Sequence, residues 1–160
     1  MFKIYIKCKR DLYYIQMPIN NIDLFKKAIE NENNAYVSSS SSQKIHDEKT
    51  KCLKMLELTK EELNYYHEKL RDYRHVDDLN SITHGSYIRW IDLKDPEKLT
   101  LSRGGILCDV KIGKKGILLL CKSHPSSFFF NINMDECLVF QRLTPQEKII
   151  LVAMDYLEQS

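Results

Sequence analysis

The sequence predicts an α+β protein in which a small, five-stranded antiparallel β-barrel of SH3-like type is flanked by helices. Five short apolar segments follow one another in the second half of the chain, at 86–91, 106–111, 117–122, 128–132 and 137–143. All five glycines lie between Gly85 and Gly116, so the sharp backbone turns are concentrated in this region. Short strands separated by turns at such intervals are typical of a compact sheet that closes on itself.

The chain of 160 residues suits one domain with appendages, and its 43% hydrophobic content is enough for a core. Changes in pattern divide it into five segments. They are an N-terminal strand–strand–helix unit (1–36), a serine-rich linker (37–43), a long helix (44–78), the small barrel (79–143) and a C-terminal helix (144–160).

The N-terminal unit begins with alternation between apolar and polar or aromatic residues from Phe2 to Cys8, which indicates a half-buried strand. A second strand is expected to end at Pro18, because proline cannot donate to a β-ladder. Asn21 can then cap a helix. A unit of this size needs the rest of the chain to complete its core.

The segment 37–43 contains a run of five serines, Ser38 to Ser42. Small polar side chains bury too little apolar surface to offset the entropy lost on ordering. We therefore expect a flexible linker here.

The segment 44–78 carries a heptad stripe of mostly apolar residues whose spacing alternates between four and three. The stripe consists of Cys52, Leu56, Thr59, Leu63, Tyr66, Leu70 and Tyr73. It demands a partner surface, which is either the barrel of the same chain or a second molecule. The predicted interaction seam consists of Leu56, Leu63, Tyr66, Leu70 and Tyr73. Thr59 to Glu62 also fits a capping box, at which the helix could restart.

Turn and core positions can be assigned within the barrel. Trp90 is expected to be a core anchor, and the pair Gly104-Gly105 allows a bulge or a positive φ. The sequence from Gly113 to Gly116 predicts a tight hairpin. Because alternate strand residues share a face, Phe129 should point away from the barrel interior, toward the C-terminal helix.

The C-terminal helix has the clearest local signal in the chain. Thr144 can cap it, Pro145 suits the first helical position, and Glu147 completes a capping box. The helix continues through Leu157 with a broad apolar surface, which predicts that it docks on another element.

Composition excludes several classes. The net charge of +2 is too small to indicate a polyanion partner by itself. No apolar run reaches the length of a membrane span, and the N-terminus lacks the apolar core of a signal peptide. The five cysteines, an odd number at irregular spacing, are interpreted as free thiols on the reducing side of the cell.

The sequence contains no recognisable catalytic or cofactor site. Three cysteines and one histidine would suit zinc in type, but only two of them are closely spaced: the set is Cys108, Cys121, His124 and Cys137. Cysteines in apolar strands usually act as small hydrophobic residues, so no metal is predicted. No phosphate-binding loop is present either. We expect no enzyme activity, no cofactor and no small-molecule substrate.

One stretch resembles a known protein group. Asn80-Ser81-Ile82, Gly85 and Ile88-Arg89-Trp90 are followed by Arg103-Gly104-Gly105-Ile106-Leu107. This pattern resembles uncharacterised proteins of giant viruses, the nucleocytoplasmic large DNA viruses, over 79–143. Those proteins have proline where this chain has Thr83, and usually tyrosine at Trp90. The resemblance implies a viral origin, with localisation in the host cytoplasm (the viral factory) or the virion.

The sequence therefore favours a non-enzymatic binding or assembly module that contacts a protein partner, or itself, through the barrel edge and the helix seam. The alternative is a weak nucleic-acid-binding protein that uses a basic hairpin and an aromatic platform on the barrel. The residues assigned to that alternative are Arg89, Trp90, Arg103, Lys114 and Lys115.

Overall fold

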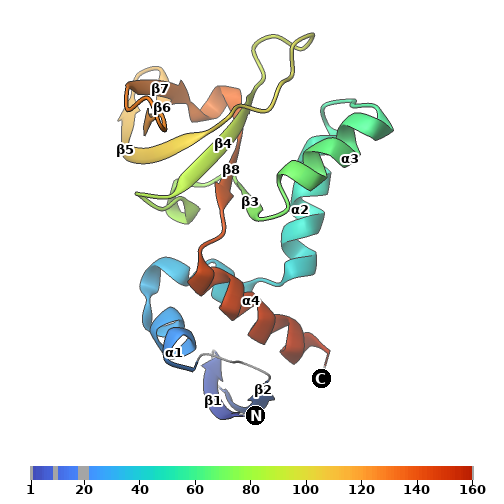
Figure 1. The fold of residues 1–160 in the computed structure, drawn as a ribbon, viewed down its shortest axis with the longest axis vertical. Coiled ribbons are helices and arrows are strands. Elements are labelled where there is room, and N and C mark those ends of the chain that lie inside the picture. Colours follow the sequence, from blue (N-terminus) through green and yellow to red (C-terminus); the bar gives the residue numbers. More distant parts are fainter. Residues whose placement is uncertain (1, 9–10, 18–21, 160) are drawn as a thin grey trace. The chain divides into compact units, whose positions relative to one another are not determined.

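The computed structural model describes residues 2–8, 11–17 and 22–159, with side chains from Ile22 onward. It is an α+β structure, and the described part contains four α-helices, a two-stranded hairpin and a six-stranded antiparallel sheet (Figure 1). Contacts divide the chain into two compact units. The first consists of Met1–Lys44 with Thr144–Ser160, and the second of Ile45–Leu143.

The first unit contains the predicted strand–strand–helix order. Strands β1 (Phe2–Cys8) and β2 (Asp11–Met17) pair antiparallel, and helix α1 (Ile22–Glu30) follows. Helix α4 (Pro145–Glu158) begins with the predicted capping box at Thr144 and packs on α1, where Phe25 and Ala153 are buried. Helix α4 belongs to the first unit, whereas Phe129, which was expected to point toward this helix, belongs to the second unit and is exposed within it.

The serine-rich segment is ordered rather than a flexible linker. Two 3₁₀ turns, Glu32–Asn34 and Val37–Ser39, lead directly into helix α2 (Ser42–Lys54). Ser40 and Ser41 are buried. The expectation of a flexible linker was wrong because the segment is held both locally and by a distant residue. Ser38 Oγ donates to Asn34 O at 3.0 Å, and Ser42 N donates to Asp155 Oδ1 at 2.8 Å.

The predicted single helix over 44–78 is two helices and a strand. Helix α2 ends at Lys54, α3 (Lys60–Lys69) starts afresh from the capping box at Thr59, and β3 (Tyr73–Val76) follows. Glu57, between the helices, has a φ of 53°, which no helix interior accommodates. The heptad spacing continues through this break, so periodicity alone could not reveal it.

All five predicted strands are present: β4 (Tyr87–Asp92), β5 (Gly105–Gly113), β6 (Gly116–Lys122), β7 (Phe129–Asn133) and β8 (Cys137–Arg142). Strand β3 is a sixth, and the order is β3-β8-β4-β5-β6-β7. Among the described strands, no ladder joins β3 to β7. The sheet is therefore open, and a closed five-stranded barrel is not confirmed.

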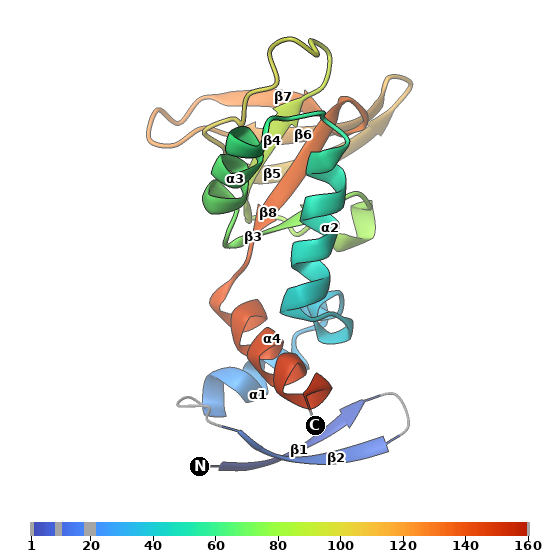
Figure 2. The ribbon, with the colours of Figure 1, turned by 90° about the vertical axis from the view of Figure 1, so that its right-hand side faces the viewer.

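The sheet of the second unit buries apolar side chains on both faces. Helices α2 and α3 cover one face, where Leu53, Leu70, Ile91 and Phe140 form a core cluster (Figure 2). A second cluster lies on the opposite face and contains Ile88, Leu107, Leu119, Cys121 and Val139, with Trp90 and Phe130 packed against it.

Glycine is required at one position beside the sheet. Gly104 has a φ of 99°, and a Cβ there would lie 2.5 Å from Tyr87 Cε1. The predicted positive φ is thus confirmed, while the irregularity of β5 falls at Cys108, between Leu107 and Asp109. The tight hairpin is also confirmed, since Gly113 pairs with Gly116 across Lys114 and Lys115.

Candidate functional site

The predicted interaction seam lies in the core of the second unit. Tyr66, Leu70 and Tyr73 are buried, and Leu56 and Leu63 pack against the same cluster as Ile91 and Phe140 of the sheet. The heptad stripe was expected to pack either on the same chain or on a second molecule. In the structure it packs on the sheet of the same chain. Leu70, which is fully buried, therefore presents no surface to a second molecule, and Tyr66 presents very little.

The residues assigned to nucleic-acid binding do not form one surface. Arg89 and Trp90 are neighbours in β4 and point to opposite faces: Trp90 packs on the cluster around Ile88, with its ring centroid 5.4 Å from that of Phe130. Lys114 and Lys115 are at the tip of the β5–β6 hairpin. Arg103 is exposed, and its carbonyl accepts a hydrogen bond from the Tyr87 hydroxyl.

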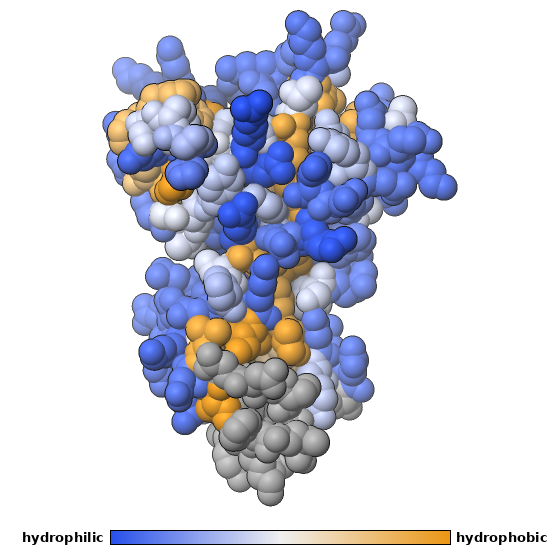
Figure 3. Space-filling model, viewed as in Figure 1, coloured by the Kyte–Doolittle hydropathy of each residue, from blue (hydrophilic) through white to orange (hydrophobic). Residues whose placement is uncertain are grey.

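Strand β7 is an edge of the sheet, and aromatic residues gather there. Phe128 and Phe129 are 60% and 59% exposed. The ring of Phe128 lies 6.1 Å from that of Phe130, which confirms that these two share a face, while Lys122 Nζ is 5.9 Å from the ring centroid of Phe129 on the other face. Figure 3 shows apolar surface at this end of the sheet.

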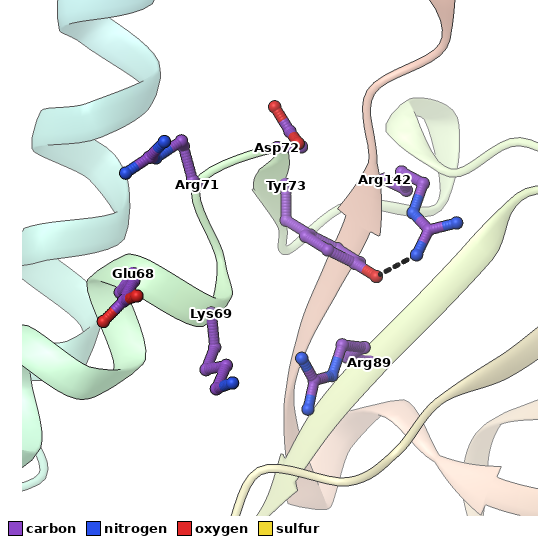
Figure 4. A pocket seen from close by; sticks show the side chains of 7 residues that line it. All are labelled: Glu68, Lys69, Arg71, Asp72, Tyr73, Arg89 and Arg142. Carbon is purple, nitrogen blue, oxygen red and sulfur yellow. Dashed lines mark hydrogen bonds between the residues drawn. The ribbon is translucent and has the colours of Figure 1, made fainter.

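A basic pocket opens on the helix-covered side of the sheet, beside the carboxyl end of α3 (Figure 4). Its volume is about 380 Å³. Four cationic side chains line it, together with two carboxylates and one tyrosine: Lys69, Arg71, Arg89 and Arg142, then Glu68 and Asp72, then Tyr73. Two predicted site residues line this pocket, Arg89 of the nucleic-acid set and Tyr73 of the interaction seam.

Both strand arginines of the pocket are held by uncharged groups. Arg89 Nε donates to Ser102 O at 2.8 Å. Arg142 Nη2 donates to the Tyr73 hydroxyl at 3.1 Å, and the guanidinium lies 4.6 Å from the ring centroid of Tyr87. Within the described residues, neither arginine forms an ion pair with a carboxylate.

Sequence reasoning missed most of this pocket. The one available signal was the alternation of side chains along each strand. It places Arg89 on the same face of β4 as Tyr87, and Arg142 on the same face of β8 as Phe140. The pairing of β8 with both β3 and β4 brings these residues together, and no local pattern predicts it.

The cysteine set resembles structural thiols. Among residues 22–159, no three His, Cys, Asp or Glu side chains are arranged to hold a metal ion. Burial raises the pKa of Cys121 to about 12, and that of Cys137 to about 11. Both thiols are therefore protonated near neutral pH. Cys108 is exposed.

Comparisons with protein families, curated proteins and solved structures found no match for this chain. In the part of the chain that the structure describes, no helix has both the length and the apolar character needed to cross a bilayer.

Proposed function

We propose that the protein is a non-enzymatic binding module whose edge strand β7 takes up an extended segment of a protein partner. The carrying observation is that β7 is an unprotected edge. Its sequence, Phe-Phe-Asn-Ile-Asn, contains no charged residue and no proline. Natural edge strands usually carry such residues, because a bare row of backbone donors and acceptors recruits other strands.

The opposite edge of the sheet supports this interpretation by contrast. Strand β3 has only four residues and contains Arg74, which is buried and donates to the carbonyl of Ser81. A short strand with an inward-pointing charge is a recognised way to block strand addition. One edge is guarded in this manner, and the other is not.

The pairing of β7 with β6 indicates which backbone groups are available. Ser123 N donates to Phe128 O at 2.9 Å, so these opposed residues form a hydrogen-bonded pair. Hydrogen-bonded and non-hydrogen-bonded pairs alternate along an antiparallel ladder. Phe130 and Ile132 therefore bond to β6, while the N–H and C=O groups of Phe129 and Asn131 point outward.

The side chains at this edge suggest the chemistry of the partner. Phe130 and Ile132 lie on one face of β7, together with Phe128 just before the strand, and Phe129 lies on the other face beside Lys122. Aromatic residues at an edge favour an added strand with apolar residues at alternate positions. We infer a partner segment of that pattern, in the viral setting implied by the resemblance over 79–143.

The nucleic-acid alternative has less support. Arg89 and Trp90 lie on opposite faces of β4, and the hairpin lysines lie apart from both. A stacking platform beside a basic groove needs these residue types on one surface. The alternative therefore serves as a competing outcome in the experiment below.

The first experiment uses the full-length protein to select peptides from a display library of random linear sequences. The affinity of a selected peptide is then measured by fluorescence anisotropy for two variants at one position. Asn131→Pro removes an outward N–H without touching the bonds to β6, whereas Asn131→Ala keeps it. We expect Asn131→Pro to weaken binding about tenfold, because proline cannot donate the backbone hydrogen bond to the added strand. Asn131→Ala keeps that donor and should change the affinity little.

A second pair of variants tests the side chains. Phe129→Ser should weaken the same peptide, while Ile112→Ser should not, although Ile112 is 77% exposed and equally apolar. Equal affinity of the wild type and Asn131→Pro would rule out strand addition. Tighter binding of a labelled single-stranded oligonucleotide, lost in a Lys114→Glu, Lys115→Glu variant, would favour the alternative instead.

A further inference from the structure

The pocket beside the carboxyl end of α3 has no role in strand addition at β7, and its side chains fit a different ligand. Lys69, Arg71, Arg89 and Arg142 carry four positive charges against the two negative charges of Glu68 and Asp72. In Figure 4, Lys69 and Arg89 extend toward the same side of the cavity from α3 and β4, and the Asp72 carboxylate turns away from both. Arg71 also extends away from Lys69 and Arg89 in this view, so the excess of positive charge at the cavity rests on Lys69, Arg89 and Arg142.

The two arginines are oriented before any ligand arrives. Arg89 uses Nε to bond Ser102 O, and this leaves both of its terminal nitrogens for another acceptor. Arg142 is fixed by the Tyr73 hydroxyl and lies against the rings of Tyr73 and Tyr87. A guanidinium held by neutral partners keeps its full charge and its fork geometry for an anion, and loses little side-chain entropy on binding.

The opposite rim of the pocket is also anchored. Lys49, which is 4% exposed, donates from Nζ to Leu70 O at 2.8 Å, and Leu143 N donates to Asp72 O at 2.8 Å. These bonds fix the turn between α3 and β3 against α2 and the end of β8. Lys69 and Arg71 are consequently carried on a segment whose backbone is tied on two sides.

We propose that this pocket binds a phosphate monoester. Two oriented arginines with a lysine match a dianion with three acceptor oxygens, since guanidinium groups bind phosphate through paired N–H donors. The cavity of about 380 Å³ is larger than a phosphate group alone and lies at the lower end of the range for small-molecule sites. The ester could belong to a free metabolite or to a phosphorylated side chain, which present the same group to the pocket.

The experiment measures binding to the full-length protein by isothermal titration calorimetry at fixed ionic strength. The probes are inorganic phosphate, adenosine monophosphate, phosphoserine and, as a monoanion, acetate. We expect saturable binding of the phosphate probes and none of acetate. Adenosine monophosphate binding most tightly would assign the site to free phosphate esters, and phosphoserine binding most tightly would assign it to phosphorylated side chains.

Variants separate a built site from diffuse attraction. Arg89→Gln and Lys69→Gln should each weaken the tightest probe by about tenfold, because each removes charge-assisted hydrogen bonds. Lys69 is exposed, so its replacement tests the pocket even if Arg89→Gln perturbs the strand. Lys114→Gln with Lys115→Gln removes two charges elsewhere and should leave affinity unchanged. Equal weakening by this control, unchanged affinity in the pocket variants, or binding of acetate as tight as phosphate would overturn the proposal.

The two proposals fail separately. If Asn131→Pro loses peptide binding but still binds phosphate, the result supports strand addition at β7 and leaves the pocket proposal untouched. If Lys69→Gln loses phosphate binding but still binds the peptide, the result supports the pocket proposal and leaves strand addition untouched.

Discussion

His75 of β3 lies against Phe140 of β8, with their ring centroids 5.7 Å apart. Burial lowers the pKa of this imidazole, and the carboxylates of Asp77 and Glu48 oppose the shift without reversing it. The unfolded chain therefore takes up a proton at higher pH than the folded protein does. The stability linked to His75 is complete above about pH 6.5 and is lost as the pH falls through the lower folded pKa.

We expect the melting temperature of the wild type to fall between about pH 7.5 and pH 5, and His75→Gln to show a smaller fall. The two proteins are compared by how steeply the melting temperature changes with pH, because the substitution also changes packing and so shifts the melting temperature at every pH. His84→Gln is the control for loss of an imidazole as such, because His84 is exposed, with its Nε2 3.9 Å from a carboxylate oxygen of Asp109. Part of the acid sensitivity should persist in His75→Gln, because burial and nearby His46 and Lys49 lower the pKa of His67 as well. Parallel slopes for His75→Gln and the wild type would contradict the assignment.

Helices α2 and α3 demonstrate how a correct pattern can predict the wrong element. The stripe from Cys52 to Tyr73 does bury one side, but it does so across a break at Glu57 and into strand β3. A helix that packs on a sheet and a helix in a coiled coil have the same spacing of apolar residues. Only the partner surface distinguishes them, and that surface is supplied by Ile91 and Phe140, far along the chain.

Leu70→Ala should lower the free energy of unfolding by about 2–5 kcal/mol, since Leu70 is fully buried in this cluster. Met55→Ala, at a position 73% exposed between the helices, should change it by less than about 0.5 kcal/mol. Chemical denaturation followed by Trp90 fluorescence measures both. Light scattering should give one molar mass for the wild type and both variants. A changed mass in Leu70→Ala without lost stability would mean that the stripe contacts a second molecule.

Local chemistry made some elements predictable. The capping box at Thr144, the hairpin at Gly113–Gly116 and the alternation of Phe128 and Phe130 each depend on a few adjacent residues, and the structure contains all three. The order of the serine segment could not be predicted in this way, because burial of Ser40 and Ser41 depends on what surrounds them. The basic pocket could not be predicted either, because its residues come from distant parts of the chain: Lys69 and Arg142 are 73 positions apart (142 − 69).

At the scale of the whole molecule, the two compact units differ in how the chain builds them. The second is one continuous segment, Ile45–Leu143, whereas the first combines the N-terminal segment with Thr144–Ser160. Each has its own buried cluster: Phe25 with Ala153 in the first, and the two clusters of the sheet in the second. Separate cores favour separate cooperative unfolding.

Trp90, the only tryptophan, lies in the second unit and reports on that unit alone. Phe25→Ala truncates the largest fully buried side chain among the described residues of the first unit, and Leu107→Ala truncates a fully buried side chain of the second. Each should cost about 2–5 kcal/mol. In urea, we expect Leu107→Ala to lower the midpoint of the Trp90 fluorescence change, and Phe25→Ala to leave it in place while lowering a transition seen by circular dichroism. If Phe25→Ala moves the fluorescence midpoint as far as Leu107→Ala does, the two units unfold together, and the edge and pocket variants must then be compared at matched global stability.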